Sequence, residues 1–195
     1  MDKKYKKAKV CFYIMTKNRA IILDRDGTLI EDKNFAYKIE DLELLPGVIK
    51  GLKLLQEDFI FFIVTNQSGI GRGYYTEEDF HKFNNHLIQL LESEKIEIIK
   101  TYYCPHLRED DCDCRKPKTK FIEEIINDFD VDIKESWMFG DHPSDIQFGI
   151  NGGCRTVFLT TGHGENHIDE LESLKIKPTI ISKDFSSATK EILDF

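Results

Sequence analysis

From residue 20 onward the chain alternates short apolar-rich runs with longer amphipathic segments. The short runs predict strands at residues 20–23, 59–64, 98–103, 136–139, 156–159 and 179–182. The run at 59–64 is apolar throughout, which is typical of a strand covered on both faces. This alternation indicates βαβ units around a mostly parallel sheet, and therefore an α/β fold.

Three of the intervening segments carry apolar residues at helical spacing, and Thr76 is expected to cap the second of them, with Asp79 as its capping-box partner. We assign the apolar residues of all three segments to the core: Val48, Ile49, Leu52 and Leu55; Phe80, Phe83, Leu87, Leu90 and Leu91; Phe121, Ile122, Ile125, Ile126 and Phe129. His81 and His86 lie outside these stripes and are expected on the surface.

The length of 195 residues fits one domain. We expect residues 1–18 to form an N-terminal extension and residues 19–195 to form a single domain. The Lys-rich start and the apolar stretch at 10–15 superficially resemble a secretory signal, but the stretch is too short and no small-residue cleavage site follows it. We interpret this region as a solvated tail that enters an edge strand.

The net charge of −8 disfavours nucleic acid as a partner, because binding phosphate backbones requires a basic face. No segment is long and apolar enough to span a membrane. Three of the five cysteines cluster beside a histidine, which suits a metal site in a reducing cytoplasm better than a disulfide framework. We therefore expect a cytoplasmic, monomeric protein with a small soluble substrate.

Polar motifs follow several of the predicted strands at their carboxyl ends. Asp24 and Asp26 follow the first strand, Thr65 ends the second, and Asp141 and Asp145 follow the fourth. Because ligands of open α/β sheets bind beyond the carboxyl ends of the strands, these side chains should share one cleft. The glycine after Asp26 allows a sharp bend, and the arginine between the two aspartates should turn away from the cleft.

A second cluster lies between the third predicted strand and the third helix. Cys104, His106, Cys112 and Cys114 offer three thiolates and one imidazole within eleven residues, which is the donor set of a tetrahedral zinc site. Four protein ligands leave no position for water, so the ion would be structural. It would fix the backbone that carries Arg115 and Lys116, so removing zinc should degrade substrate binding while leaving the chemistry at Asp24 intact.

Together these motifs resemble the haloacid dehalogenase (HAD) superfamily of aspartyl-phosphate phosphotransferases, over residues 20–159. Within it, the chain resembles the zinc-containing D-glycero-D-manno-heptose 1,7-bisphosphate 7-phosphatases and the related histidinol-phosphatases. The resemblance implies a three-layer Rossmann-like HAD fold with a zinc-bound loop. The intervals between the motifs hold no insertion large enough for a separate cap domain, so loops should roof the cleft.

The resemblance also implies the chemical roles. Asp24 would be the nucleophile that forms an aspartyl-phosphate, and Asp26 would be the general acid and base. A catalytic Mg²⁺ would be held by Asp24, the backbone carbonyl of Asp26 and Asp141, with Asp145 behind these ligands. Thr65 and Lys116 would stabilise the transferred phosphoryl group. Substrate contacts are expected from Asp32, Lys33, Asn34, Phe35, Asn66, Gln67, Ser68, Arg115 and His142.

Two parts of the chain point to different relatives. The segment 65–73 resembles the heptose enzymes, whereas the short loop between His106 and Cys112 resembles the histidinol-phosphatases. We give more weight to the first because it adjoins the phosphate cleft. His142 departs from both patterns, which usually carry a lysine or arginine there, and an imidazole at this position could favour activity at acidic pH.

The resulting hypothesis is a Mg²⁺-dependent phosphomonoesterase that acts on heptose 1,7-bisphosphate, a small phosphorylated sugar, in precursor supply for bacterial surface glycans. Histidinol phosphate is the alternative substrate. A polynucleotide 3′-phosphatase shares the first two motifs but conflicts with the acidic charge. A non-catalytic zinc-bearing scaffold would not need the aspartates and the lysine together.

Overall fold

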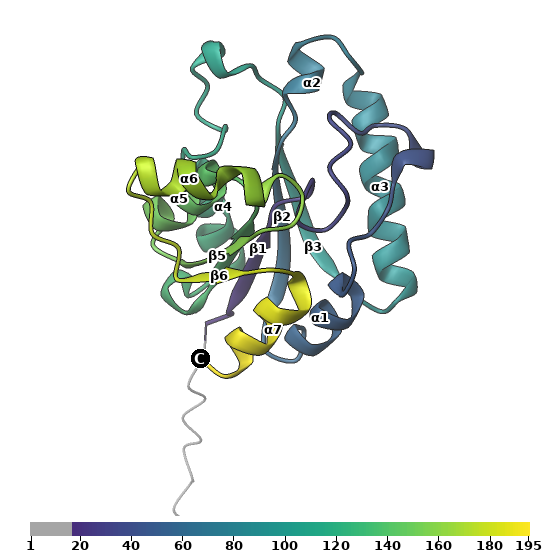
Figure 1. Cartoon of the computed structure of the whole chain (residues 1–195). Coiled ribbons are helices and arrows are strands. Elements are labelled where there is room, and N and C mark those ends of the chain that lie inside the picture. The colour runs from purple at the N-terminus through teal and green to yellow at the C-terminus, as the bar shows by residue number, and fades with distance from the viewer. Residues whose placement is uncertain (1–16) are drawn as a thin grey trace, which may run out of the picture.

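A computed structural model describes residues 17–195 (Figure 1). The expected edge strand at 10–15, and most of the expected extension at 1–18, lie outside the described residues. The strands are β1 (Ala20–Leu23), β2 (Ile60–Asn66), β3 (Ile98–Cys104), β4 (Trp137–Gly140), β5 (Arg155–Leu159) and β6 (Ile180–Ser182). The helices are α1 (Val48–Leu55), α2 (Ser68–Gly71), α3 (Glu77–Ser93), α4 (Lys120–Phe129), α5 (Pro143–Gly152), α6 (Gly164–Ser173) and α7 (Phe185–Leu193).

The six strands form one sheet in the order β3-β2-β1-β4-β5-β6, and every pair is parallel. The prediction of an α/β fold with a mostly parallel sheet is confirmed. Each predicted strand is present, with ends that differ from the expected ones by no more than two residues. β1 lies between β2 and β4, so the residues that follow it stand near the middle of the sheet edge.

Alternate side chains of β1 enter two different cores. Ile21 and Leu23 pack with apolar residues of α1, α3 and α7, whereas Ala20 and Ile22 pack with those of α4 and α5. The sheet is therefore covered on both faces, which produces the expected three layers (Figure 1). Within residues 17–195 no separate cap unit interrupts these layers.

The helix start predicted at Thr76 is confirmed. The Thr76 hydroxyl accepts a hydrogen bond from the Asp79 N–H at 3.1 Å, and the Asp79 carboxylate accepts one from the Thr76 N–H at 3.0 Å. These two bonds satisfy backbone donors that the first turn of α3 leaves free. His81 and His86 are exposed on α3, as expected.

In the described part of the chain, no helix combines the length and the apolar character needed to cross a membrane.

Candidate active site

The carboxyl ends of β1, β2 and β4 surround a cleft of about 460 Å³. Asp24 follows β1, Thr65 lies near the end of β2, and Asp141 follows β4 directly. Lys116 reaches the same cleft from the loop between β3 and α4, and Asp145 reaches it from the first turn of α5. The parallel sheet thus brings together residues that are as much as 121 positions apart in the sequence, from Asp24 to Asp145.

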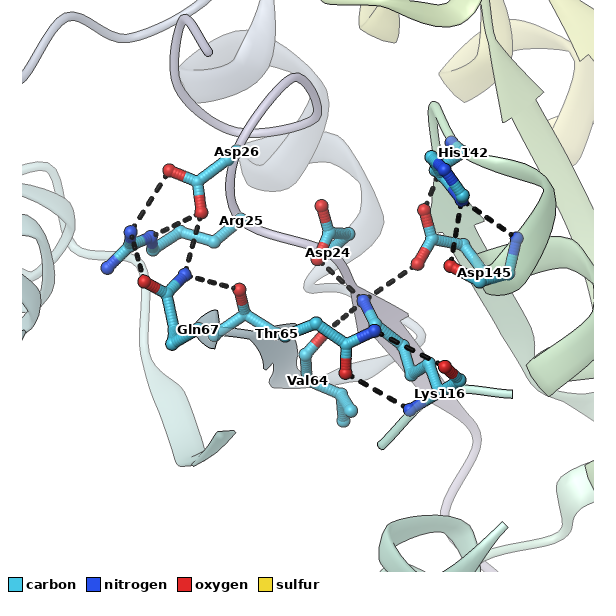
Figure 2. A network of polar contacts seen from close by, with 11 residues as sticks. Asp24, Arg25, Asp26, Val64, Thr65, Gln67, Lys116, His142 and Asp145 are labelled. Carbon is cyan, nitrogen blue, oxygen red and sulfur yellow. Dashed lines mark hydrogen bonds and ion pairs between the residues drawn. The ribbon is translucent and has the colours of Figure 1, made fainter. Parts of the chain in front are cut away.

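Lys116 is the centre of the polar network in the cleft (Figure 2). Its ammonium lies 2.6 Å from Asp24 Oδ1 and 2.7 Å from Asp145 Oδ1, and it donates to the backbone carbonyl of Val64 at 2.6 Å. Burial alone would lower the pKa of Lys116, but the carboxylates of Asp145 and Asp24 raise it above its ordinary value. The lysine is therefore held as a cation although it is only 3% exposed.

The carboxylates around Lys116 outnumber the positive charge. Burial raises the pKa of Asp24 to about 7, although Lys116 opposes this shift, and the nearby Asp145 and Asp26 add to it. Burial, together with Asp24 and Asp145, raises the pKa of Asp141 to about 8. One lysine cannot neutralise three buried carboxylates, so this cluster is suited to binding a cation.

The donor set at this cluster fits Mg²⁺. Asp24, Asp141 and Asp145 each offer an oxygen within 4.8 Å of the others, and Mg²⁺ prefers hard oxygen ligands. Asp145 already accepts hydrogen bonds from Lys116 at one oxygen and from the His142 N–H, at 3.1 Å, at the other. Asp24 Oδ2 and Asp141 Oδ1 accept none from the described residues, so these two oxygens are the ones available to an ion.

Gly27 lets the backbone after β1 pass close to the carboxylate of Asp141. Its φ of 76° lies in the left-handed region, and a Cβ at this position would collide with the carboxylate of Asp141. The expected sharp bend after Asp26 is therefore present, and only glycine fits it without strain.

Asp26 lines the cleft, but its carboxylate is held from behind by two buried residues (Figure 2). Arg25 donates to Asp26 Oδ1 at 3.0 Å and to Oδ2 at 3.1 Å, and Gln67 Nε2 donates to Oδ2 at 2.8 Å. Arg25 does turn away from the cleft, yet it is only 1% exposed, and its guanidinium lies 4.8 Å from the ring centre of Phe83. The motif alone indicated no role for this arginine, and its two hydrogen bonds identify it as a residue that orients Asp26.

Two of the predicted substrate contacts are instead committed to the protein. Both oxygen and nitrogen atoms of the Gln67 side-chain amide are bonded within the fold, since Nε2 donates to Thr65 and Asp26 while Oε1 accepts from Tyr75 and Arg25. Gln67 is 3% exposed and does not line the cleft. Asn66 does line it, but its amide pairs with the backbone N–H and carbonyl of Lys116.

The loop after β1 contributes part of the cleft wall. Asp32, Asn34 and Phe35 line the cleft as predicted, and Phe35 has a φ of 67°, a left-handed conformation that is uncommon for a bulky residue. Lys33 points elsewhere and pairs with Glu43 at 3.2 Å. Lys33 does not line the cleft, and neither does Ser68, the first residue of α2. These two residues therefore lie apart from the other predicted substrate contacts.

Arg115 and His142 line the cleft, as predicted. Burial lowers the pKa of His142 from its ordinary value, despite the nearby Asp145. The imidazole is therefore neutral over a wider pH range than sequence analysis assumed. The cleft is also lined by three residues to which the motifs assigned no role, namely Ser144, His163 and His167.

The four predicted zinc ligands converge in the loop that follows β3. Cys104 Sγ lies 3.5 Å from Cys112 Sγ and 3.7 Å from His106 Nδ1. Cys114 Sγ lies 3.5 Å from Cys112 Sγ and 3.3 Å from His106 Nδ1. Tetrahedral zinc, with Zn–S bonds near 2.3 Å, separates its ligand atoms by about 3.5–3.8 Å. The cluster therefore fits a four-coordinate zinc ion.

Comparisons with known proteins agree with this geometry. A family model described as HAD-hydrolase-like matches residues 113–188. The D-glycero-alpha-D-manno-heptose-1,7-bisphosphate 7-phosphatase of Campylobacter jejuni is 42% identical over 144 residues, which cover 73% of this chain and 83% of that protein. The D-glycero-beta-D-manno-heptose-1,7-bisphosphate 7-phosphatase of Haemophilus influenzae is 36% identical over 180 residues, which cover 85% of this chain and 98% of that protein.

A solved structure shares the whole architecture. The D,D-heptose 1,7-bisphosphate phosphatase from B. bronchiseptica, complexed with magnesium and phosphate, has a TM-score of 0.82 and 27% sequence identity, and the match covers 90% of this chain and 98% of that chain. The chain is therefore a HAD-type phosphatase, a phosphoric monoester hydrolase, and belongs to the family of D-glycero-D-manno-heptose-1,7-bisphosphate 7-phosphatases.

Proposed function

We propose that this protein removes the 7-phosphate of D-glycero-D-manno-heptose 1,7-bisphosphate in a Mg²⁺-dependent reaction, and that residues 19–195 act as one phosphatase domain. The observation that carries the proposal is the convergence of Asp24, Lys116 and Asp141 in one buried cluster at the sheet edge. The identity with named heptose enzymes over most of their length supports this substrate over histidinol phosphate.

In the proposed mechanism, Asp24 attacks the phosphorus atom. The bond between phosphorus and the sugar oxygen breaks, and Asp26 donates a proton to the departing oxygen. Asp26 then takes a proton from water, which attacks the aspartyl-phosphate and releases inorganic phosphate and free Asp24. Arg25 and Gln67 keep the carboxylate of Asp26 at the side of the cleft from which it can serve both steps.

The remaining charged residues stabilise the transferred group. Lys116 and Thr65 would bind the phosphoryl oxygens on which negative charge accumulates. A Mg²⁺ ion held by Asp24, the backbone carbonyl of Asp26 and Asp141 would neutralise the repulsion between the nucleophile and the phosphate. Asp145 contributes indirectly, because its two oxygens hold Lys116 and the backbone N–H of His142.

The sugar and its second phosphate would extend from the phosphate position toward the rim of the cleft. Asp32, Asn34, Phe35, Arg115 and His142 all line the cleft, which supports their role as substrate contacts. A zinc ion bound by Cys104, His106, Cys112 and Cys114 would be structural, because these four ligands complete a tetrahedral shell. It would hold the loop that carries Arg115 and Lys116.

The test is a comparison of kcat/KM for both anomers of heptose 1,7-bisphosphate and for histidinol phosphate, with the zinc-loaded protein and excess Mg²⁺. We expect the heptose compound to be preferred by at least about 100-fold, because rejection of a poorly matched polar substrate is typically strong. A preference for histidinol phosphate would overturn the substrate assignment.

The mechanism has its own test. Borohydride added during turnover should convert the phosphorylated aspartate to homoserine, and peptide mass spectrometry should locate it at position 24. Asp24→Asn should abolish both turnover and trapping. Asp128→Asn changes an exposed aspartate of α4 and serves as the matched control that retains both. Modification at another residue would refute Asp24 as the nucleophile.

A further inference from the structure

A second group of metal-ligating side chains lies on the rim of the catalytic cleft, outside both metal sites described above. His142 precedes α5, and His167 and Glu170 lie on α6. One ligand atom from each of these residues lies within 4.8 Å of the other two. His167 and Glu170 are three positions apart on one helix, so their side chains project from the same face.

The three side chains already contact one another. His167 Nδ1 lies 2.7 Å from Glu170 Oε2, and the ring centres of His142 and His167 are 4.5 Å apart at an interplanar angle of 64°. Metal–nitrogen and metal–oxygen bonds of about 2.0–2.2 Å place neighbouring ligand atoms about 3.0–3.5 Å apart, from octahedral to tetrahedral geometry. An ion could therefore replace the proton between His167 and Glu170 after these two atoms move apart by about 0.3–0.8 Å.

His142 can serve as a ligand after a change of tautomer that keeps one of its two contacts with Ser144. Its Nδ1 now accepts a hydrogen bond from the Ser144 N–H at 3.1 Å and lies 2.9 Å from the Ser144 hydroxyl. In the other tautomer Nδ1–H would donate to that hydroxyl, the hydrogen bond from the Ser144 N–H would be given up, and Nε2 would be free to bind an ion. Metal-bound histidines commonly donate their second ring nitrogen to such a neighbour.

We propose that His142, His167 and Glu170 form a third metal site, which takes a divalent transition-metal ion of the Zn²⁺ and Ni²⁺ class at the rim of the cleft. A site of two imidazoles and one carboxylate favours ions of this class over Mg²⁺, which prefers oxygen ligands. The site stands at the boundary between the cleft, which His142 and His167 line, and a neighbouring hollow of about 500 Å³, which His142 and Glu170 line. Three protein ligands leave the ion an open coordination position.

The test uses Ni²⁺ as the probe, titrated calorimetrically at alkaline pH into the full-length protein loaded with zinc and saturated with Mg²⁺. Wild type should bind one additional Ni²⁺ per chain. His167→Gln and Glu170→Gln should each weaken this binding at least tenfold. His86→Gln, which changes an exposed histidine of α3, is the matched control and should bind as wild type does.

A second measurement identifies the site that is filled. Absorption of the Ni²⁺-loaded protein should lack thiolate charge-transfer bands, since the proposed ligands include no sulfur. Melting curves will show that the variants are folded, which is expected because these side chains are at the surface. The proposal fails if wild type binds no additional ion, if both variants retain wild-type affinity, or if thiolate bands account for the bound Ni²⁺.

Discussion

Replacing Asp141 by asparagine should stabilise the metal-free protein while abolishing turnover. The side chain of Asp141 is 4% exposed, and its pKa of about 8 shows that the fold disfavours its charge. Asparagine has nearly the same shape and carries no charge. Its oxygen can accept the hydrogen bond that the His163 N–H now donates to Asp141 Oδ2 at 3.0 Å. The substitution removes the electrostatic cost and keeps the contact.

The sign and size of the effect follow from linkage. A carboxyl with a raised native pKa binds its proton more tightly in the folded state, so stability is lost as pH rises from 3.8, its ordinary value, toward about 8. Near pH 7.5 the full cost would be about 5 kcal/mol. Water in the open cleft reduces it, so we expect Asp141→Asn to gain about 2 kcal/mol, or about 4–8 °C in Tm for a chain of this size.

The assay is thermal unfolding of the zinc-loaded, Mg²⁺-free proteins over a series of pH values. The difference between Asp141→Asn and wild type should grow from acidic to neutral pH, and Mg²⁺ should raise the Tm of wild type much more than that of the variant. Asp128→Asn, an exposed carboxylate on α4, should change little at any pH. A variant that melts at or below wild type throughout the series would refute the electrostatic reasoning.

Three further predictions concern the same cleft. Mg²⁺ affinity should rise at least about 100-fold between about pH 6 and pH 8, because Asp24 and Asp141, with pKa values of about 7 and 8, must be deprotonated to bind the ion. Calorimetry in two buffers should measure the protons that are released. An affinity independent of pH would contradict this prediction. Arg25→Met should lower kcat about 10- to 100-fold with little change in KM, since Asp26 loses its orienting partner; unchanged kcat would remove that role. Chelation of zinc from the folded protein should raise KM for the heptose substrate by loosening the loop at Arg115, and an unchanged KM would separate this loop from substrate binding.

The positions of Asp24, Asp141 and the strands could be predicted because each depends on local pattern and one topological rule. Apolar runs of strand length locate the sheet, and parallel strands end at a common edge. The convergence of Cys104, His106, Cys112 and Cys114 could be predicted for a similar reason, since their chemistry and spacing are contained in one short segment. Features of this kind need no knowledge of how distant side chains orient.

The features that sequence analysis did not predict depend on side-chain direction after the chain has folded. The network around Gln67 joins residues of the loop after β1, of β2 and of the segment before α3, so the motif that contains Gln67 does not reveal its bonds within the fold. Lys33 and Phe35 are two positions apart, yet only Phe35 lines the cleft because left-handed backbone at Asn34 and Phe35 redirects the loop. The segment that carries His163 and His167, which is the start of α6, shows no motif at all.

The position of Lys116 shows how the fold holds a buried side chain that a loop supplies. Cys114, two residues earlier, belongs to the Cys/His cluster, and the amide of Asn66 pairs with both backbone polar groups of Lys116 itself. The ammonium then has three oxygen partners, one of them a backbone carbonyl of β2. Because β2 fixes both Asn66 and this carbonyl, the rigid sheet positions the lysine even though its own segment is irregular. Loss of zinc should therefore disturb the more distant Arg115 side of the loop before it displaces Lys116.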